Sequence, residues 1–296
     1  MSFTRDVKDE ISKDLLNEIE NRYLLLGYIF VNGIFSDNKL SIHLENMAVA
    51  RKLFKTFKYS YKSEVKMTLR VQKKFKVKQI FIFEVDNSKH IFDDEIKNID
   101  FSDSESLYSF VKGIFLASGS INDPKSGSYH LELVFDDYDK ARWALDLLSE
   151  CSFKFKYLKR TSMHMLYLKS GEEISDFLKL LGATNSVFYF EDIRIYRDHK
   201  NMVNRLNNCE QANLEKSLNT SQSQIDIINY LKDQSYFSLL DEKTQQVANY
   251  RVMYSEASFR ELADIIGREI DKKISKSYIN HHFRKINELY DRVQKE

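Results

Sequence analysis

The stretch Leu25-Leu26-Gly27-Tyr28-Ile29-Phe30-Val31-Asn32-Gly33 returns 86 residues later as Val111-Lys112-Gly113-Ile114-Phe115-Leu116-Ala117-Ser118-Gly119. Glycine occupies the third and the ninth positions of both copies. The apolar pattern predicts that each copy lies on a helix, and a glycine inside a helix costs about 1 kcal/mol relative to alanine. Two such helices need a packing reason, so we expect them to approach backbone to backbone at Gly27 and Gly113.

The repeat extends beyond these two motif helices. The segment Ser41-Ile42-His43-Leu44-Glu45 returns as Ser128-Tyr129-His130-Leu131-Glu132, and the basic pair Lys73-Lys74 returns as Lys159-Arg160. Solenoid repeats are usually about 20–50 residues long, which is shorter than this period. The sequence therefore predicts a duplicated half-domain with pseudo-two-fold symmetry.

Both halves have the same predicted element order of helix, strand, helix, strand and strand. In the first half these elements are residues 17–32, 40–45, 47–57, 64–71 and 77–85. In the second half they are residues 105–118, 129–135, 138–148, 154–158 and 163–169. A short amphipathic helix, 3–11, comes first, and another, 172–181, ends at Gly182, a residue type favoured at helix C-termini. The predicted fold class is α+β, with two antiparallel sheets and the motif helices forming a pseudo-two-fold saddle.

Apolar residues take every second position of the strand at 64–71, which predicts one buried face and one polar face. The apolar positions are Val65, Met67, Leu69 and Val71. The polar positions between them are Lys66, Thr68 and Arg70.

The net charge of +1 conceals an uneven distribution of charge along the chain. Residues 51–78 contain eleven Lys and Arg against one acid, whereas residues 84–105 contain eight acids against two lysines. Basic side chains that point outward from a sheet can neutralise DNA phosphates. An alternative is a solvated basic edge that protects the sheet from aggregation. We predict a secondary DNA surface that comprises Lys66, Arg70, Lys73, Lys74, Lys159 and Arg160.

A second domain follows a polar, asparagine-rich segment. We predict a first domain over 1–206, with halves at about 17–100 and 105–190, a linker over 207–222, and an all-helical domain over 223–296. In this last domain, a helix capped by Ser258 and ended by Gly267 precedes a connector and a final helix capped by Ser275.

This order is typical of a helix-turn-helix, whose second helix enters the major groove. We expect Asn280 to address adenine and Arg284 to address guanine, because their side chains match the edges of those bases. Phosphate contacts come from the basic and hydroxyl side chains around them. The predicted contacts, within a helix-turn-helix of about Ser258 to Arg292, are Arg260, Lys272, Lys273, Ser275, Lys276, Ser277, Asn280, His281, Arg284 and Lys285.

The repeated stretches resemble the LAGLIDADG motif of homing endonucleases, whose eighth position is a metal-binding aspartate. Here that position holds Asn32 and Ser118. Hydrolysis of DNA on this scaffold needs a carboxylate from each motif helix to hold divalent metal, and magnesium prefers charged oxygen ligands. We therefore predict no metal, no cofactor and no catalytic residue, with Asn32 and Ser118 as vestigial positions. Asp37 and Asp123 are predicted turn residues; the alternative is an active nuclease in which they replace the missing ligands.

A second resemblance extends nearly from end to end of the chain, and the segments that carry it are residues 113–124, 191–194, 204–213 and 274–286. In these segments the chain resembles the WhiA family of bacterial DNA-binding regulators. The resemblance implies a degenerate LAGLIDADG domain joined to a helix-turn-helix, double-stranded DNA as partner, and a role in transcription regulation, cell division and chromosome segregation. In actinobacteria the family works with a WhiB-like iron–sulfur regulator.

Composition excludes several other classes of protein. The sequence predicts no signal peptide and no membrane span, and two cysteines are too few for a disulfide framework. We expect a cytoplasmic, nucleoid-associated protein that binds specific DNA sequences and is not an enzyme. The alternative is a nucleoid-associated or protein-interaction scaffold with weak sequence preference.

Overall fold

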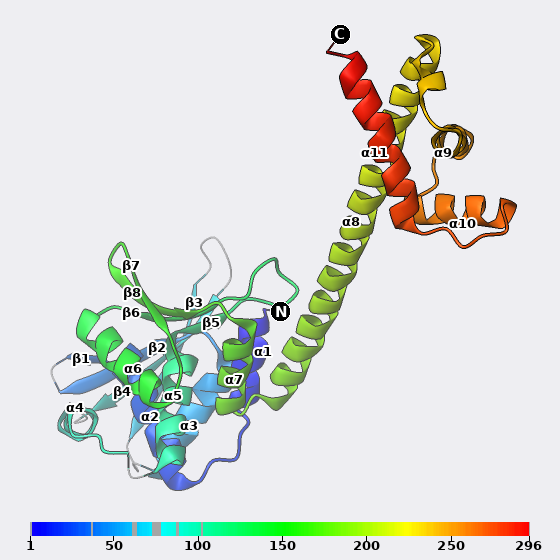
Figure 1. The fold of residues 1–296 in the computed structure, drawn as a ribbon. Helices are drawn as coiled ribbons and strands as arrows, with labels where there is room; N and C mark the ends of the chain where they lie inside the picture. The colour runs from blue at the N-terminus through cyan, green and yellow to red at the C-terminus, as the bar shows by residue number, and fades with distance from the viewer. Residues whose placement is uncertain are drawn as a thin grey trace. The chain divides into compact units, whose positions relative to one another are not determined.

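The computed structural model describes residues 2–36, 38–60, 64–72, 78–86, 89–101 and 103–295 (Figure 1). The chain divides into two compact units, Met1–Asp198 and His199–Glu296, and each has a hydrophobic core of its own. Among the described residues, no helix is both long and apolar enough to cross a membrane.

The first unit contains the two predicted halves. α1 (Phe3–Ile11) comes before the first half, which comprises α2 (Glu18–Asn32), β1 (Ile34–Ser36), β2 (Lys39–Leu44), α3 (Met47–Ser60), β3 (Val65–Gln72), β4 (Lys78–Asp86) and α4 (Lys89–Lys97). The second comprises α5 (Ser104–Ser118), β5 (Gly119–Ile121), β6 (Leu131–Phe135), α6 (Tyr138–Glu150), β7 (Lys156–Arg160), β8 (Met163–Leu168) and α7 (Gly171–Leu180). The antiparallel sheets have equivalent strand orders, β1-β2-β4-β3 and β5-β6-β8-β7, which confirms the predicted duplication.

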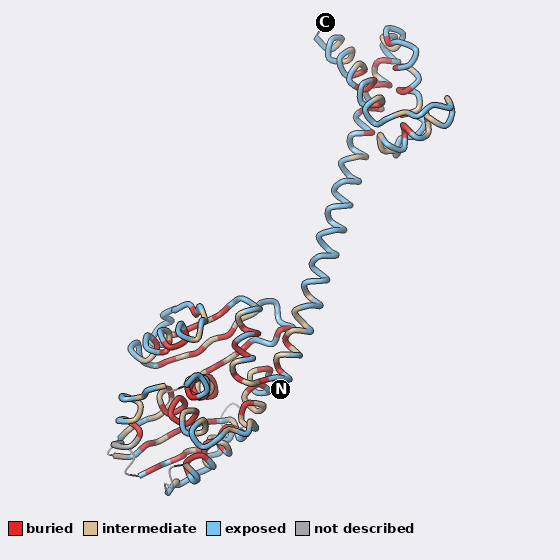
Figure 2. Tube along the Cα trace, turned by 60° about the horizontal axis from the view of Figure 1, so that its bottom comes forward, coloured by how far each residue is buried: buried red, intermediate tan, exposed pale blue. Residues whose placement is uncertain are grey.

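The motif helices α2 and α5 pack against each other at the centre of this unit (Figures 1 and 2). An ideal Cβ on Gly27 would lie 2.1 Å from the carbonyl oxygen of Phe110, and one on Gly113 would lie 2.1 Å from that of Leu24. No side chain fits at either position, so the predicted backbone-to-backbone approach is confirmed.

The ends of these helices follow from local sequence. The side chain of Asn17 accepts from the backbone N–H of Glu20, whose carboxylate accepts from the backbone of Asn17 in return, a reciprocal cap that begins α2. Asp103 caps α5 through the backbone N–H of Ser106. Gly182 has a φ of +75° just after α7, as the C-terminal glycine predicts.

The predicted burial of the apolar face of β3 is wrong. Met67, Leu69 and Val71 remain 49%, 50% and 46% exposed. The reason is the position of β3 in the sheet. Among the described strands, β3 lies at the edge and pairs with β4 alone, so no further strand covers its apolar side chains.

The second unit is entirely helical. α8 (Thr184–Asp233) begins in the first unit and continues into the second, where α9 (Glu242–Met253), α10 (Phe259–Glu269) and α11 (Lys276–Val293) follow a short 3₁₀ turn at Tyr236–Leu239. Residues 207–222 therefore lie within one helix, and they are almost all exposed (Figure 2). Residues 223–231, where the predicted all-helical domain begins, are the last part of α8 rather than a separate helix.

Candidate nucleic-acid interface

The eighth positions of both motifs lie at matched places in the first unit. Asn32 is the last residue of α2, and Ser118 is the last residue of α5. The Asn32 amide donates to the carbonyl oxygen of Ala117 at 3.1 Å, so it joins the two helices. Asn32 also interacts with the hydroxyl of Tyr28, a side chain whose burial raises its pKa to about 12. The Ser118 hydroxyl is buried with no hydrogen-bond partner in the part of the chain that the structure describes.

These residues do not fit the divalent metal of a homing endonuclease. Both side chains are neutral, whereas magnesium prefers charged oxygen ligands, and the Asn32 amide nitrogen donates across the helix pair. Within the described ranges, no three His, Cys, Asp or Glu side chains form a group that could hold a metal ion. The Asp123 carboxylate accepts from the backbone N–H of Lys125 at 2.9 Å, which is the geometry of a turn residue. Asp37 lies outside the described residues.

Strand pairing decides which face of each sheet carries the predicted basic residues. Lys66 and Arg70 lie opposite Glu84 and Ile80, and directly opposed residues share a face. That face is the reverse of the one that carries buried Phe83, which packs on α3. Lys66 and Arg70 therefore point away from the helices. Lys73 and Lys74, which the sequence predicts on the same DNA surface, lie outside the described residues.

The second sheet separates the other predicted pair of basic residues. Tyr157 lies opposite buried Leu166, and alternation places Lys159 on that same helix-covered face. Arg160, opposite Met163, lies on the outer face. The structure thus brings Lys66 and Arg70 together on one sheet, and places Arg160, but not Lys159, on the corresponding face of the other.

The helix pair of the second unit has well-defined ends. The Ser258 side chain accepts from the N–H of Glu261, and the Glu261 carboxylate accepts from the N–H of Ser258, so a reciprocal cap begins α10. α10 runs two residues past its predicted end at Gly267. A Cβ on Gly267 would lie 2.7 Å from the Lys272 carbonyl oxygen, so this glycine admits the returning connector rather than ending the helix. Ser275 caps α11, as predicted.

Most of the predicted DNA contacts are exposed around the connector and the outer face of α11. These exposed residues are Arg260, Lys272, Lys273, Ser275, Lys276, Ser277, Asn280, His281 and Arg284. Lys285 differs from them, because its ammonium group pairs with the Asp241 carboxylate at 2.8 Å. That ion pair joins α11 to the start of α9 and holds the pKa of Asp241 well below its usual range.

Buried polar residues fix α11 on α9, and sequence reasoning did not single them out. The His282 ring lies 2.7 Å from the Thr244 hydroxyl, and burial lowers the pKa of His282. Arg251, only 1% exposed, stacks on the rings of Phe259 and Phe283 at 5.5 and 5.7 Å. Its apolar neighbours at helical spacing were the only sequence signal for that burial.

Arg251 holds the turn between α9 and α10 in place. The guanidinium donates to the Ser221 hydroxyl at 3.2 Å and to the carbonyl oxygens of Tyr254 and Ala257. The buried Arg251 side chain therefore connects α8, at Ser221, with the α9–α10 turn and with Phe283 of α11. These contacts fix α11 in place against α9 and the α9–α10 turn.

Comparison with known proteins covers nearly the whole chain. Family models match residues 20–96 as a WhiA N-terminal LAGLIDADG-like domain, 107–200 as a WhiA LAGLIDADG-like domain, and 203–290 as a WhiA C-terminal HTH domain. Proteins named "Probable cell division protein WhiA" are 35% identical over 312 residues in Bacillus cytotoxicus and 33% identical over 311 in Enterococcus faecalis. These alignments cover 99% of this chain and 98% and 99% of those proteins. The crystal structure of full-length DUF199/WhiA from Thermotoga maritima has a TM-score of 0.61 at 24% identity, with 99% of each chain covered.

Proposed function

Because the chain belongs to the WhiA family, we propose that it binds specific sequences of double-stranded DNA through α10 and α11 and regulates transcription in cell division and chromosome segregation. The exposed N-terminal half of α11 carries this proposal. Lys276, Ser277, Asn280 and Arg284 project from a helix whose opposite face is fixed by Ile279, Phe283 and Ile286. A rigid helix with exposed donors at its N-terminal end is what major-groove readout requires.

The domain boundaries follow from assigning DNA reading to the C-terminal helices. We propose residues 1–206 as the degenerate LAGLIDADG-like domain, 207–222 as the connection and 223–296 as the DNA-reading domain. A cytoplasmic protein at the nucleoid, working with a second transcription regulator, agrees with this role.

We propose further that the protein does not cut DNA. In-line hydrolysis on a LAGLIDADG scaffold uses carboxylates at the ends of both motif helices, where this chain has Asn32 and Ser118. Supercoiled plasmid incubated with the protein and magnesium or manganese should stay intact. Metal-dependent nicking that disappears in Asp123→Ala would overturn this part of the proposal.

A protein-interaction platform is the second candidate for the saddle. The outer face of the first sheet carries Glu84 directly opposite Lys66, and Asp86 pairs with Lys39 at 3.2 Å. These acids offset part of the positive charge, which favours a mixed-charge protein contact over DNA binding at this face.

The test of sequence reading compares two asparagines on one helix. Chromatin immunoprecipitation of the full-length protein supplies bound sequences, and fluorescence anisotropy then measures affinity for one of them. Asn280→Ala should weaken binding by about 1–3 kcal/mol, because bidentate recognition of adenine is lost. Asn287→Ala is the matched control, because Asn287 is also exposed but lies nearer the end of α11, and it should change little. Equal effects of the two substitutions would contradict base readout by Asn280.

A further inference from the structure

The basic run at residues 51–78 is divided between two faces of the first unit. Lys66 and Arg70 lie on the outer face of β3, whereas Arg51, Lys52 and Lys55 belong to α3. α3 packs on the other face of the sheet, where the ring of Phe57 lies 6.4 Å from that of Phe83. The cations of α3 therefore cannot join the strand residues in one DNA surface.

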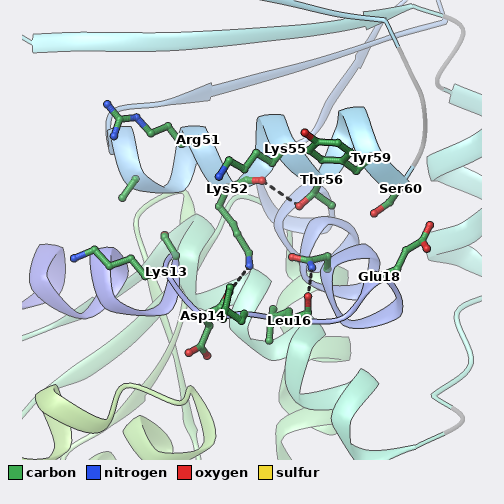
Figure 3. A pocket seen from close by; sticks show the side chains of 14 residues that line it. Lys13, Asp14, Leu16, Glu18, Arg51, Lys52, Lys55, Thr56, Tyr59 and Ser60 are labelled. Atoms are coloured by element: carbon green, nitrogen blue, oxygen red, sulfur yellow. Dashed lines mark hydrogen bonds between the residues drawn. The ribbon is translucent and has the colours of Figure 1, made fainter.

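These cations line a cavity of about 750 Å³ between α3 and the segment that joins α1 to α2 (Figure 3). Arg51, Lys55 and Tyr59 recur every fourth residue, so they form one stripe along the helix. The facing wall consists of Ser12 to Leu16 and Glu18. The volume is within the range of small-molecule sites, about 300–1,000 Å³.

The facing wall is anchored at Asp14. The Lys52 ammonium group donates to the Asp14 backbone carbonyl at 2.7 Å (Figure 3). Lys112 of α5 pairs with the Asp14 carboxylate at 3.2 Å. The carboxylate charge at Asp14 is thus already compensated. Among the described residues, Lys13, Arg51 and Lys55 form no ion pair, so their positive charge is available to a ligand.

The two ends of the cavity differ in chemistry. Figure 3 shows Lys13 and Arg51 at one end, and Tyr59, Ser60 and Glu18 at the other. Tyr59 is 72% exposed, so its ring is free to stack on a planar group. A carboxylate beside such a ring can accept hydrogen bonds from the amino or hydroxyl groups of a ligand.

We propose that this cavity binds a nucleotide, with its phosphates against Lys13, Arg51 and Lys55 and its base against Tyr59. The cationic end matches phosphate oxygens, because a guanidinium presents paired donors and lysine adds point charges. The opposite end offers the ring of Tyr59 to the base and the carboxylate of Glu18 to the amino or hydroxyl groups of the nucleotide. The outer face of the sheet, with Lys66 and Arg70, is on the other side of the strands, so a partner bound there leaves the cavity open.

The test is calorimetric titration of the full-length protein with ATP, pyrophosphate and adenosine. Arg51→Ala combined with Lys55→Ala should weaken the binding of ATP and of pyrophosphate at least about tenfold. Lys58→Ala is the matched control, since Lys58 is an exposed cation of the same helix that does not line the cavity, and it should change affinity by less than about twofold. Tyr59→Ala should weaken ATP but not pyrophosphate, which separates base stacking from phosphate contact.

Three results would overturn the proposal. One is no binding of ATP at about 1 mM. Another is an equal loss in Lys58→Ala, which would show general attraction to a basic helix. The third is displacement of ATP by a random DNA duplex, together with weakened DNA binding in the Arg51→Ala and Lys55→Ala double variant. The substituted side chains are exposed, so circular dichroism should show unchanged folding. A negative result in this experiment would not bear on the proposal that α11 binds DNA.

Discussion

Single residues decide how closely the two halves of the saddle meet. Gly27 and Gly113 stand where each backbone touches the other, and Asn32 adds a hydrogen bond between the same helices. The sequence predicts the glycine contact, because a repeated helix-breaking residue needs a structural reason. It does not predict the Asn32 bond to Ala117, since that bond depends on the side-chain rotamer at the helix end.

Gly113→Ala tests this close approach. The added Cβ meets the Leu24 carbonyl oxygen at 2.1 Å, so α2 and α5 must separate. We expect a loss of about 1–3 kcal/mol in unfolding free energy, as in overpacked cores, measured by urea denaturation. Gly127→Ala is the control, because nothing lies within 4 Å of its Cβ, and it should be neutral or slightly stabilising. Equal stabilities of the two variants would contradict the tight contact.

A second residue-scale prediction concerns pH. Burial lowers the pKa of His282 in the folded state, against the opposing effect of Asp241, so the unfolded chain binds protons more readily at this site. The contribution of neutral His282 to the free energy of unfolding should be fully present above about pH 6.5 and should be lost as the pH drops below that value. His282→Gln should reduce this loss in thermal unfolding between pH 7 and pH 5. A variant with unchanged pH dependence would show that His282 does not carry the effect.

At the scale of elements, sequence periodicity predicts most helices and strands, but it does not predict which strands pair or which elements pack against each other. The edge position of β3 leaves Met67 and Leu69 exposed, and only strand register separates Lys159 from Arg160. The basic run looks continuous in sequence, although α3 and β3 present its members on opposite faces of one sheet. Long-range pairing, which no local pattern encodes, decides these outcomes.

The outer sheet faces give a prediction at this scale. If they attract DNA phosphates, changing Lys66, Arg70 and Arg160 together to glutamate should weaken full-length binding and flatten its salt dependence by about 0.9 per lost contact. The matched control is Lys159→Glu, on the helix-covered face, which should leave the salt slope nearly unchanged. If the triple variant binds as tightly as the native chain across a salt series, the saddle is a protein-interaction platform.

At the scale of the whole molecule, the duplicated half-domain and the helix-turn-helix are both evident from the sequence, because each depends on local repeats and caps. The continuous helix from Thr184 to Asp233 is not, since its polar, asparagine-rich middle resembles an irregular linker. The internal supports of α11, Arg251 and His282, are also missed, because buried polar residues look like surface residues until their partners are known.

The central claim is that α11 reads DNA sequence, and one competition measurement tests it most directly. Anisotropy compares the native protein and Arg284→Ala on an immunoprecipitated site and on a scrambled duplex at the same salt concentration. We expect the native protein to prefer the site, and Arg284→Ala to lose about 1–3 kcal/mol on the site but less on the scrambled duplex. Equal affinity of the native protein for both duplexes, or equal losses on both in Arg284→Ala, would contradict sequence reading by α11.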